Sequence, residues 1–307
     1  MDNELILFDR LEVIKSTNQK YDLENNAYIS FSGGKDSTIL HYLIDMALPN
    51  NHIPRVFINT GIEYNYIVDF VKELASKDDR FIILKPSQPI KPMLERVGYP
   101  FKSKEHSMRV DQFNKGSNAK FIKKYLGQTD YKGQFVCPKS LLYQFEEKGK
   151  YHYSNLCCNE LKKKPIHKWQ KENKRYISIT GMRKEEGGTR KSLNCIITKN
   201  GKAVKFHPLA IVDDEWENEF IKRNNIQLCK LYYPPFNFDR TGCKGCPLAL
   251  KLQEQLDTML MYLPNEKKQC EMIWKPIYEE YRKLGYRLRK DNGQMNIFEY
   301  EEKEKEK

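Results

Sequence analysis

The segment of residues 27–47 constrains the fold more than any other part of the sequence. Residues 27–31 are short, apolar and rich in β-formers, so they predict a buried strand. After a loop, apolar side chains recur at helical spacing: Ile39, Leu40, Leu43 and Met46. The loop itself reads Ser-Gly-Gly-Lys-Asp-Ser and must turn sharply from strand into helix. A strand that enters a helix in this way is typical of an α/β sheet domain.

That junction is predicted to bind an anion. Glycines let the backbone come close to a ligand, and the unpaired amides at the start of a helix favour negative charge. Lys35 adds a cation, but Asp36 would be repelled by phosphate unless it caps the helix or helps to hold Mg²⁺. The predicted phosphate-binding residues are Ser32, Gly33, Gly34, Lys35, Asp36 and Ser37.

The loop departs from the Walker motif, GxxxxGK[ST], in its glycine spacing and in the place of its lysine. It resembles the PP-loop, SGGxDS, of the ATP pyrophosphatases and of the phosphoadenosine phosphosulfate (PAPS) reductase family. The resemblance implies a HUP-like α/β fold and an adenosine nucleotide ligand. That ligand is ATP, with Mg²⁺, or else PAPS or adenylyl sulfate. The alternative interpretation is a glycine turn before an ordinary helix, without a ligand.

A second candidate binding segment follows the predicted strand 55–59. It reads Asn59-Thr60-Gly61-Ile62-Glu63, a polar strand end of the kind where open α/β sheets bind ligands. It resembles the family's DTGxE motif, which lines the adenosine pocket, with Asn59 in place of the usual aspartate. The resemblance implies that Asn59, Thr60 and Gly61 contact the nucleotide.

A third candidate segment follows the β-rich run 175–180. Arg183 and Arg190 lie on a glycine-bearing loop and suit bidentate contact with phosphate or sulfate oxygens. The loop is similar to the family's GxRxxES…R segment, which implies a nucleotide-contacting role for Gly181 and Arg183. The alternative is an exposed charged turn. The predicted catalytic residues are Lys35, Asp36, Arg183 and Arg190.

Four cysteines form the remaining candidate site. An adjacent pair, Cys157 and Cys158, precedes a C-x-x-C of Cys243 and Cys246, and four thiolates are enough to close a metal site. Adjacent side chains diverge, which fits the separated corners of a 4Fe–4S cluster better than a single zinc. Unligated or redox-active thiols are the third alternative. The arrangement CCxxxKxxP…CxxC resembles that of the cluster-bearing adenylyl-sulfate reductases.

The alternation of strands and helices predicts a doubly wound, mostly parallel α/β sheet with a helical insertion and an α-helical C-terminal extension. An amphipathic helix is expected over residues 1–25, with Leu5, Phe8, Leu11 and either Val13 or Ile14 on its buried side. The nucleotide-binding domain is predicted over residues 26–235, with a basic helical insertion at about 99–156. A C-x-x-C and helical extension of residues 236–290 should pack on it, and residues 291–307 should be a disordered tail.

Charge and composition narrow the partners and the compartment. Lys and Arg total 53 against 41 Asp and Glu, a surplus of +12 that suits nucleotides or nucleic acid. Lysines and aromatic residues alternate in the insertion, which indicates either a DNA or RNA surface or a solvated helical face. No stretch of the sequence is apolar enough for a membrane span and no leader is visible, so we expect a cytoplasmic protein. The eight cysteines are then read as ligands or free thiols.

The reaction follows from what the chain lacks. Reductases that resemble it attack the sulfate sulfur with a cysteine in a C-terminal ECGxH-like segment, but no cysteine follows Leu284. We therefore expect a PP-loop sulfurtransferase that adenylates DNA, RNA or a small acceptor with ATP. Sulfur is then delivered with the cysteine-ligated cluster as carrier or anchor, and a thiol or sulfur donor protein is a further expected partner. One alternative is a PAPS or adenylyl-sulfate reductase that recruits an outside thiol. The other is a non-catalytic nucleotide-sensing or nucleic-acid-binding module.

Overall fold

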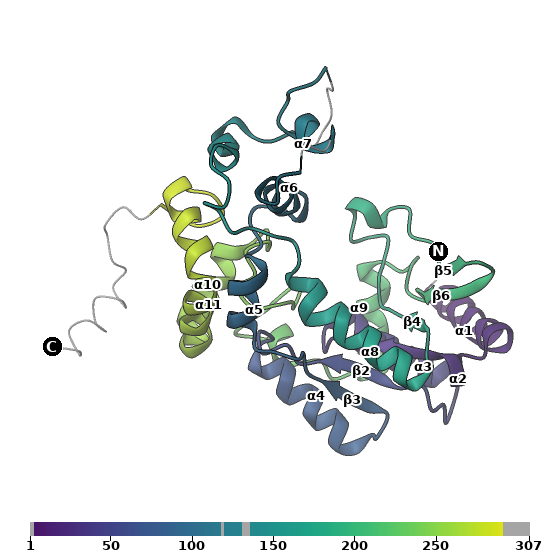
Figure 1. Ribbon diagram of the computed structural model, residues 1–307. Helices are drawn as coiled ribbons and strands as arrows, with labels where there is room; N and C mark the ends of the chain where they lie inside the picture. The colour runs from purple at the N-terminus through teal and green to yellow at the C-terminus, as the bar shows by residue number, and fades with distance from the viewer. Residues whose placement is uncertain (1–2, 118–119, 131–135, 291–307) are drawn as a thin grey trace. The chain divides into compact units, whose positions relative to one another are not determined.

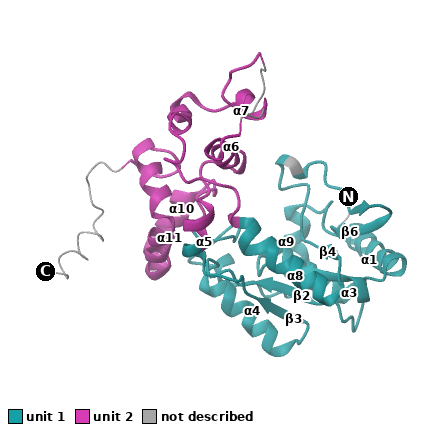
Figure 2. Cartoon of the chain, viewed as in Figure 1, with its two compact units in different colours: residues 1–92, 158–244 teal, residues 93–157, 245–307 magenta. Residues whose placement is uncertain are grey.

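A computed structural model describes residues 3–117, 120–130 and 136–290 (Figure 1). The chain divides into two compact units (Figure 2). The first unit contains residues 1–92 and 158–244, and the second contains residues 93–157 and 245–307. The predicted tail of residues 291–307 lies outside the described residues. Among the described helices, none combines the length and apolar character needed to cross a membrane.

The first unit is built on one six-stranded sheet in the order β3-β2-β1-β4-β6-β5. All neighbouring strands are parallel except β5 and β6, which are antiparallel. The predicted doubly wound, mostly parallel α/β fold is therefore confirmed. The strands are β1 Ala27–Ser30, β2 Arg55–Ile58, β3 Phe81–Leu84, β4 Ile177–Ile179, β5 Ile196–Lys199 and β6 Lys202–Phe206.

Helices cover the two faces of this sheet unequally. The main core joins β1, β4 and β6 to three helices, α1 Asn3–Tyr21, α3 Lys35–Ala47 and α9 Asp214–Arg223. A smaller cluster on the opposite face of β1 packs Tyr28 and Val56 against Trp169 of α8 Lys164–Asn173. Two further helices complete the unit, the short α2 Leu23–Asn26 and α4 Asn65–Lys77, which packs along β3. The face under α8 is thus only partly filled by side chains.

Two local predictions were wrong. In α1 the buried side chains are Ile6, Arg10, Ile14 and Thr17, whereas Leu5 and Phe8 are exposed. Polar Arg10 is buried because its guanidinium donates to the carbonyl of Pro208, so a long-range contact overrides the apolar pattern. In α3, Met46 was predicted to face the core but is exposed, and Ile44 is buried there instead.

The second unit joins the helical insertion to the C-terminal helices. Its helices are α5 Ile90–Val97, which begins at the end of the first unit, α6 Lys104–Asn114, α7 Lys120–Tyr125, α10 Leu252–Tyr262 and α11 Pro264–Leu284. Phe101 stacks on Tyr153 with ring centroids 4.6 Å apart and also meets Tyr281 of α11. The Tyr281 hydroxyl accepts from the Lys102 amide and donates to the Pro247 carbonyl. Insertion and extension therefore share one core.

Candidate functional site

The predicted phosphate loop connects β1 to α3. Gly33 has φ +72°, and a Cβ atom there would lie 2.9 Å from Cγ2 of Ile67, so the turn requires glycine. The hydroxyls of Ser32 and Ser37 are 3.0 Å apart, and Ser37 donates to the Gly34 carbonyl. The loop is therefore held in shape by its own side chains.

The first amide of α3 already has a partner. The Lys35 N–H donates to the hydroxyl of Tyr232 at 2.9 Å, and that hydroxyl is 2.9 Å from Oγ1 of Thr241. A neutral hydroxyl thus occupies one of the helix-start donors that the sequence assigned to a ligand.

The loop after β4 brings an arginine to this helix start. A Cβ atom on Gly181 would lie 2.8 Å from the main-chain oxygen of Asp36, so only glycine fits this contact. Two residues later, Nε of Arg183 lies 3.3 Å from Oδ1 of Asp36. Arg183 is 5% exposed, and its Nη1 has no hydrogen-bond partner among the described residues. Asp36 itself does not cap α3, whose first flanking residue is Gly34.

Helix α9 supplies two carboxylates that the sequence analysis missed. Glu217, whose side chain is fully buried, lies 3.0 Å from Nζ of Lys35 and 3.1 Å from Nε of Arg183. Asp214 lies 2.7 Å from Nη2 of Arg183 and 3.7 Å from Nζ of Lys35. The two cations of the loop are therefore held between acidic groups.

These contacts shift the protonation of the site. Burial, followed by the charge of Asp36, raises the pKa of Glu217 to about 7, although Arg183 and Lys35 oppose the rise. A hydrogen bond from Arg183 lowers the pKa of Asp214. Burial tends to lower the pKa of Arg183, but Glu217, Asp214 and Asp36 outweigh burial and raise it. Arg183 is thus firmly cationic, while Glu217 titrates near neutrality.

We call the hollow in front of the loop the phosphate cavity; it has a volume of about 450 Å³. Its lining includes Ser32, Gly34, Lys35, Asp36, Arg183 and Arg240. Arg190 is not among the described residues that line it. Glu186 pairs instead with both Arg190 and Arg240. Of the two predicted arginines, the structure brings only Arg183 to the loop.

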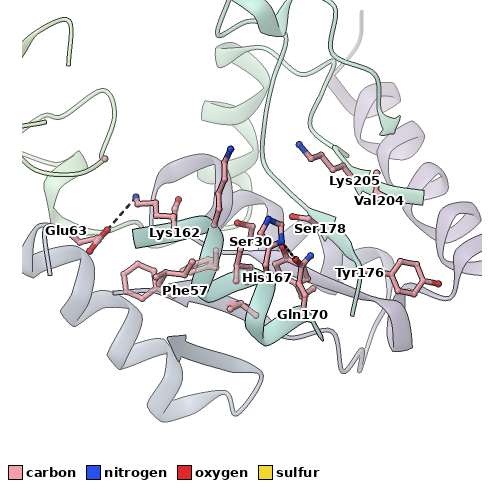
Figure 3. Close-up of a pocket in the computed structure, with 18 of the residues that line it drawn as sticks. Ser30, Phe57, Glu63, Lys162, His167, Gln170, Tyr176, Ser178, Val204 and Lys205 are labelled. Atoms are coloured by element: carbon pink, nitrogen blue, oxygen red, sulfur yellow. Dashed lines mark hydrogen bonds and ion pairs between the residues drawn. The ribbon is translucent and has the colours of Figure 1, made fainter. Parts of the chain in front are cut away.

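A second hollow, the large cavity, lies between α8 and the sheet and has a volume of about 840 Å³ (Figure 3). Ser30 lies on a central strand and is nevertheless exposed, because the sheet face above it is open. His167 and Gln170 of α8 hydrogen-bond to each other at 2.8 Å along its rim (Figure 3). Ser32 and Thr241 line both cavities. Both hollows are therefore lined in part by Ser32 of the phosphate loop.

The segment after β2 contributes through Glu63. Asn59 accepts from the Gly61 amide, and the amide and hydroxyl of Thr60 both donate to the Glu63 carboxylate. Glu63 lines the large cavity and lies 3.6 Å from Nζ of Lys162, whereas the predicted residues 59–61 are not among the described lining residues. These three residues therefore build the turn that presents Glu63.

The four grouped cysteines are divided between the two units. Cys158 and Cys243 belong to the first unit, and Cys157 and Cys246 belong to the second. Burial raises the pKa of Cys243, and Lys162 opposes that rise. Burial alone would lower the pKa of Lys162, but Cys243 and Glu63 raise it. Lys162 is thus a cation beside the Cys243 thiol.

The described residues do not assemble a metal site by themselves. In the part of the chain that the structure describes, no three His, Cys, Asp or Glu side chains are grouped so as to hold a metal ion. The donor set of two thiols in each unit does not fit a cluster within either unit. The iron–sulfur and zinc assignments therefore stay predictions.

The other four cysteines have the character of buried thiols. Burial raises the pKa of Cys137 to about 11, and it also raises the pKa of Cys195 and of Cys229. Cys270 is fully buried in α11. A high pKa keeps a thiol protonated and unreactive at neutral pH, so none of the three shifted thiols has the properties of a nucleophile.

One of the missed residues left a signal in the sequence. Glu217 interrupts the apolar side of α9 between the buried Trp216 and Phe220, and a carboxylate at a core-facing position needs a cationic partner. Tyr232 and Thr241 left no such signal, because they reach the loop from a distant segment of irregular structure.

Comparison with known proteins adds one family match. The phosphoadenosine phosphosulfate reductase domain matches residues 26–135 and 135–249. An uncharacterised protein of Methanocaldococcus jannaschii is 25% identical over 248 residues, which cover 79% of this chain and 47% of that protein. The chain therefore spans about half the length of this relative.

Solved structures resemble the chain at low identity. A phosphoadenylyl-sulfate reductase from Candida auris, in a phosphate complex, has a TM-score of 0.47 and 17% identity, covering 76% of this chain and 87% of that one. An NH₃-dependent NAD synthetase from Campylobacter jejuni has a TM-score of 0.41 and 13% identity, covering 96% and 98%. An FMN adenylyltransferase from Candida glabrata has a TM-score of 0.42 and 14% identity, covering 74% and 58%.

Proposed function

The chain belongs to the phosphoadenosine phosphosulfate reductase domain family, and on that premise we propose that it is an enzyme that activates an acceptor with ATP for sulfur transfer. The sequence feature behind the proposal is the complete SGGxDS loop, which supports a ligand that carries phosphate groups.

The observation that carries the proposal is that the two cavities share Ser32 of the phosphate loop and Thr241 in their linings. Cavities of about 300–1,000 Å³ suit small-molecule ligands, and the large cavity of about 840 Å³ lies in that range. Its lining includes the partly exposed apolar side chains Ile58 and Ile166, which suit a base, while the phosphate cavity offers Lys35 and Arg183 to the phosphates. In our proposal the adenosine occupies the large cavity and the pyrophosphate end of ATP lies on the loop.

The chemistry follows from that placement. An acceptor oxygen attacks the α-phosphorus, the bond from that phosphorus to the β-phosphate oxygen breaks, and the acceptor proton passes to water. Lys35 and Arg183 would stabilise the charge that develops on the departing pyrophosphate. Mg²⁺ bound with ATP would supply further neutralisation of the phosphates. The terminal sulfur of a donor-protein persulfide then bonds to the acceptor atom that carries the adenylated oxygen, and the bond from that atom to the oxygen breaks so that AMP leaves. A second thiol of the donor protein cleaves the sulfur–sulfur bond and forms a disulfide, which leaves the transferred sulfur on the acceptor.

Nucleic acid is the acceptor that the charge favours. The chain carries a surplus of +12, and Phe121 of α7 is 63% exposed beside Arg109, whose guanidinium carbon lies 5.4 Å from the ring centroid. Exposed aromatic rings beside cations suit stacking on bases and contact with backbone phosphate. Phe101 and Tyr125, in contrast, are buried, which fits the core role that we also considered for the insertion.

Family membership also supports a second candidate, reduction of PAPS or adenylyl sulfate. Cys270 is fully buried in a helix, so its thiol is not accessible to a nucleotide, and in this candidate we expect a thiol of another molecule to attack. Sulfite release from either nucleotide with added thioredoxin-like thiols would identify it.

The test is a pyrophosphate-release assay with ATP and Mg²⁺ over a panel of DNA, RNA and small acceptors. We expect acceptor-dependent pyrophosphate release that is lost in Lys35→Ala. The matched control is Lys77→Ala, which removes a lysine on the exposed side of α4. Absence of turnover with every acceptor, in protein that binds ATP, would contradict the proposal, and sulfite release would establish the second candidate.

A further inference from the structure

Glu217 holds a position in the phosphate site that the proposed chemistry does not use. Its carboxylate reaches Lys35 with one oxygen and Arg183 with the other, at 3.0 and 3.1 Å. Lys35 begins α3, Arg183 lies on the loop after β4, and Glu217 lies on α9. One fully buried carboxylate therefore joins three separate elements at the point where phosphate is expected to bind.

We propose that Glu217 is a positioning and specificity-determining residue of the phosphate site, which holds Lys35 and Arg183 together and competes with the ligand's phosphate for them. This inference goes beyond the proposed function and rests on it only in taking a phosphate group as the ligand.

Burial makes this competition significant. The oxygens of Glu217 are held by ion pairs to Lys35 and Arg183, and Nη1 of buried Arg183 lacks a hydrogen-bond partner among the described residues. A buried charged donor without a partner is costly, so Arg183 gains when an anion accepts from Nη1, whereas Glu217 gains nothing from a phosphate, because both only accept. The free guanidinium nitrogen indicates an anion, because it can only donate.

The cavity chemistry explains why an internal competitor matters. The phosphate cavity is lined by more acidic than basic side chains. Its five carboxylates are those of Asp36, Glu185, Glu186, Asp214 and Asp239. Its three basic side chains are those of Lys35, Arg183 and Arg240. A phosphate that enters must draw the two cations away from acidic partners. Ligands with several phosphate charges can do so, whereas a weakly charged anion cannot. Glu217 would therefore make the site selective for polyphosphate.

The protonation state of Glu217 sets the direction in which phosphate affinity changes with pH. The charged groups facing Glu217 are Lys35 and Asp36 from α3, Arg183 from the loop and Asp214 from its own helix. Below pH 7 the carboxyl is largely protonated and releases the cations to a ligand. Above pH 7 it is ionised and holds them. Phosphate affinity should therefore fall as the pH rises through 7.

The experiment measures pyrophosphate binding by calorimetry, without metal, at pH 6 and pH 8. Glu217→Gln keeps the shape of the side chain and removes its charge. Glu215→Gln is the control, because Glu215 lies exposed on the same helix. Pyrophosphate itself titrates in this range, so the readout is the affinity of each variant relative to wild type at the same pH.

For E217Q we expect a relative affinity near one at pH 6 and about tenfold tighter binding at pH 8. For E215Q the relative affinity should stay near one at both pH values. Where wild type turns over ATP, E217Q should also lower kcat at least tenfold, because the cations are no longer held together. A relative affinity for E217Q equal to that of E215Q, or weaker binding at both pH values, would overturn the inference.

If E217Q does not fold, Glu217→Asp provides the second test. Its carboxylate is one methylene shorter and still charged, so it should retain the fall in affinity with pH while kcat drops. Loss of the pH dependence in E217D would overturn the inference. The two proposals can be contradicted separately. If the protein binds no ATP but E217Q still binds pyrophosphate about tenfold more tightly than wild type at pH 8, only the proposed function is contradicted. If the protein turns over ATP but E217Q does not bind pyrophosphate more tightly at pH 8, only this inference is contradicted.

Discussion

Gly181 lies against the main-chain carbonyl of Asp36, so closely that a Cβ atom on the glycine would come within 2.8 Å of the oxygen. This contact joins the loop after β4 to the first turn of α3, although the two residues are far apart in the sequence. It sets where Arg183 meets the phosphate loop.

The first prediction concerns this contact. Gly181→Ala forces the loop away from α3, which should cost about 1–3 kcal/mol of unfolding free energy and weaken pyrophosphate binding at least tenfold. Urea unfolding and calorimetry measure the two effects. Gly242→Ala is the control for stability, since a Cβ atom there meets nothing within 4 Å. Unchanged binding in Gly181→Ala would contradict the role assigned to the contact.

The two predicted arginines should behave differently. Arg183 lines the phosphate cavity and is almost fully buried, whereas Arg190 is not among its described lining residues and pairs with Glu186. Arg183→Gln should weaken pyrophosphate binding by about 2–3 kcal/mol, because a charged donor to the phosphate is lost. Arg190→Gln should change it less than threefold. Equal losses in both variants would show that Arg190 also reaches the ligand.

Acid should destabilise the protein through its buried histidines. Burial lowers the pKa of His41 and of His106 to about 4, from an ordinary value of 6.5. Between these values the unfolded chain binds protons that the folded chain excludes, so stability falls as the pH drops from about 6.5 toward 4. The linkage amounts to about 1.4 kcal/mol per pKa unit, or roughly 3 kcal/mol for each histidine at pH 4.

Urea unfolding at pH 7, 5.5 and 4.5 measures this loss. His106→Gln should reduce the loss of unfolding free energy between pH 7 and pH 4.5, because glutamine can still hydrogen-bond to Tyr125 and Gln144 but does not titrate. His52→Gln, at an exposed position, should lose as much unfolding free energy at acid pH as wild type. An equal loss in both variants would count against a neutral, buried His106.

The cysteine group yields a prediction about metal content. If the four grouped thiols bind a 4Fe–4S cluster, anaerobically purified protein should contain about four iron and four labile sulfide per chain. Cys158→Ser and Cys243→Ser should each abolish that content, and Cys195→Ser should not. One zinc without sulfide would indicate the tetrahedral alternative. A metal-free protein in which all eight thiols react with a thiol reagent after unfolding would leave only free cysteines.

The sequence by itself determined the kind of fold and the loop at which a ligand is expected. Glycines between an apolar β-run and a helical repeat specify a strand–loop–helix junction, and alternating elements specify a parallel sheet. These patterns lie within some twenty residues of each other, so local spacing is enough to recognise them. For the same reason Lys35 and Gly181 were found as candidates before any contact was known.

The tertiary structure alone decided which side chains meet. Lys35 and its partner Tyr232 are 197 positions apart, and Arg183 and Asp214 are 31 apart. No periodicity links such residues, because their contact depends on how the sheet orders its strands. The same reason explains why the insertion joined the C-terminal helices and why Arg183, not Arg190, reached the cavity. Glu217 shows the limit most clearly, since its charge was visible in the sequence but its two cationic partners depended on the packing of α9 against α3.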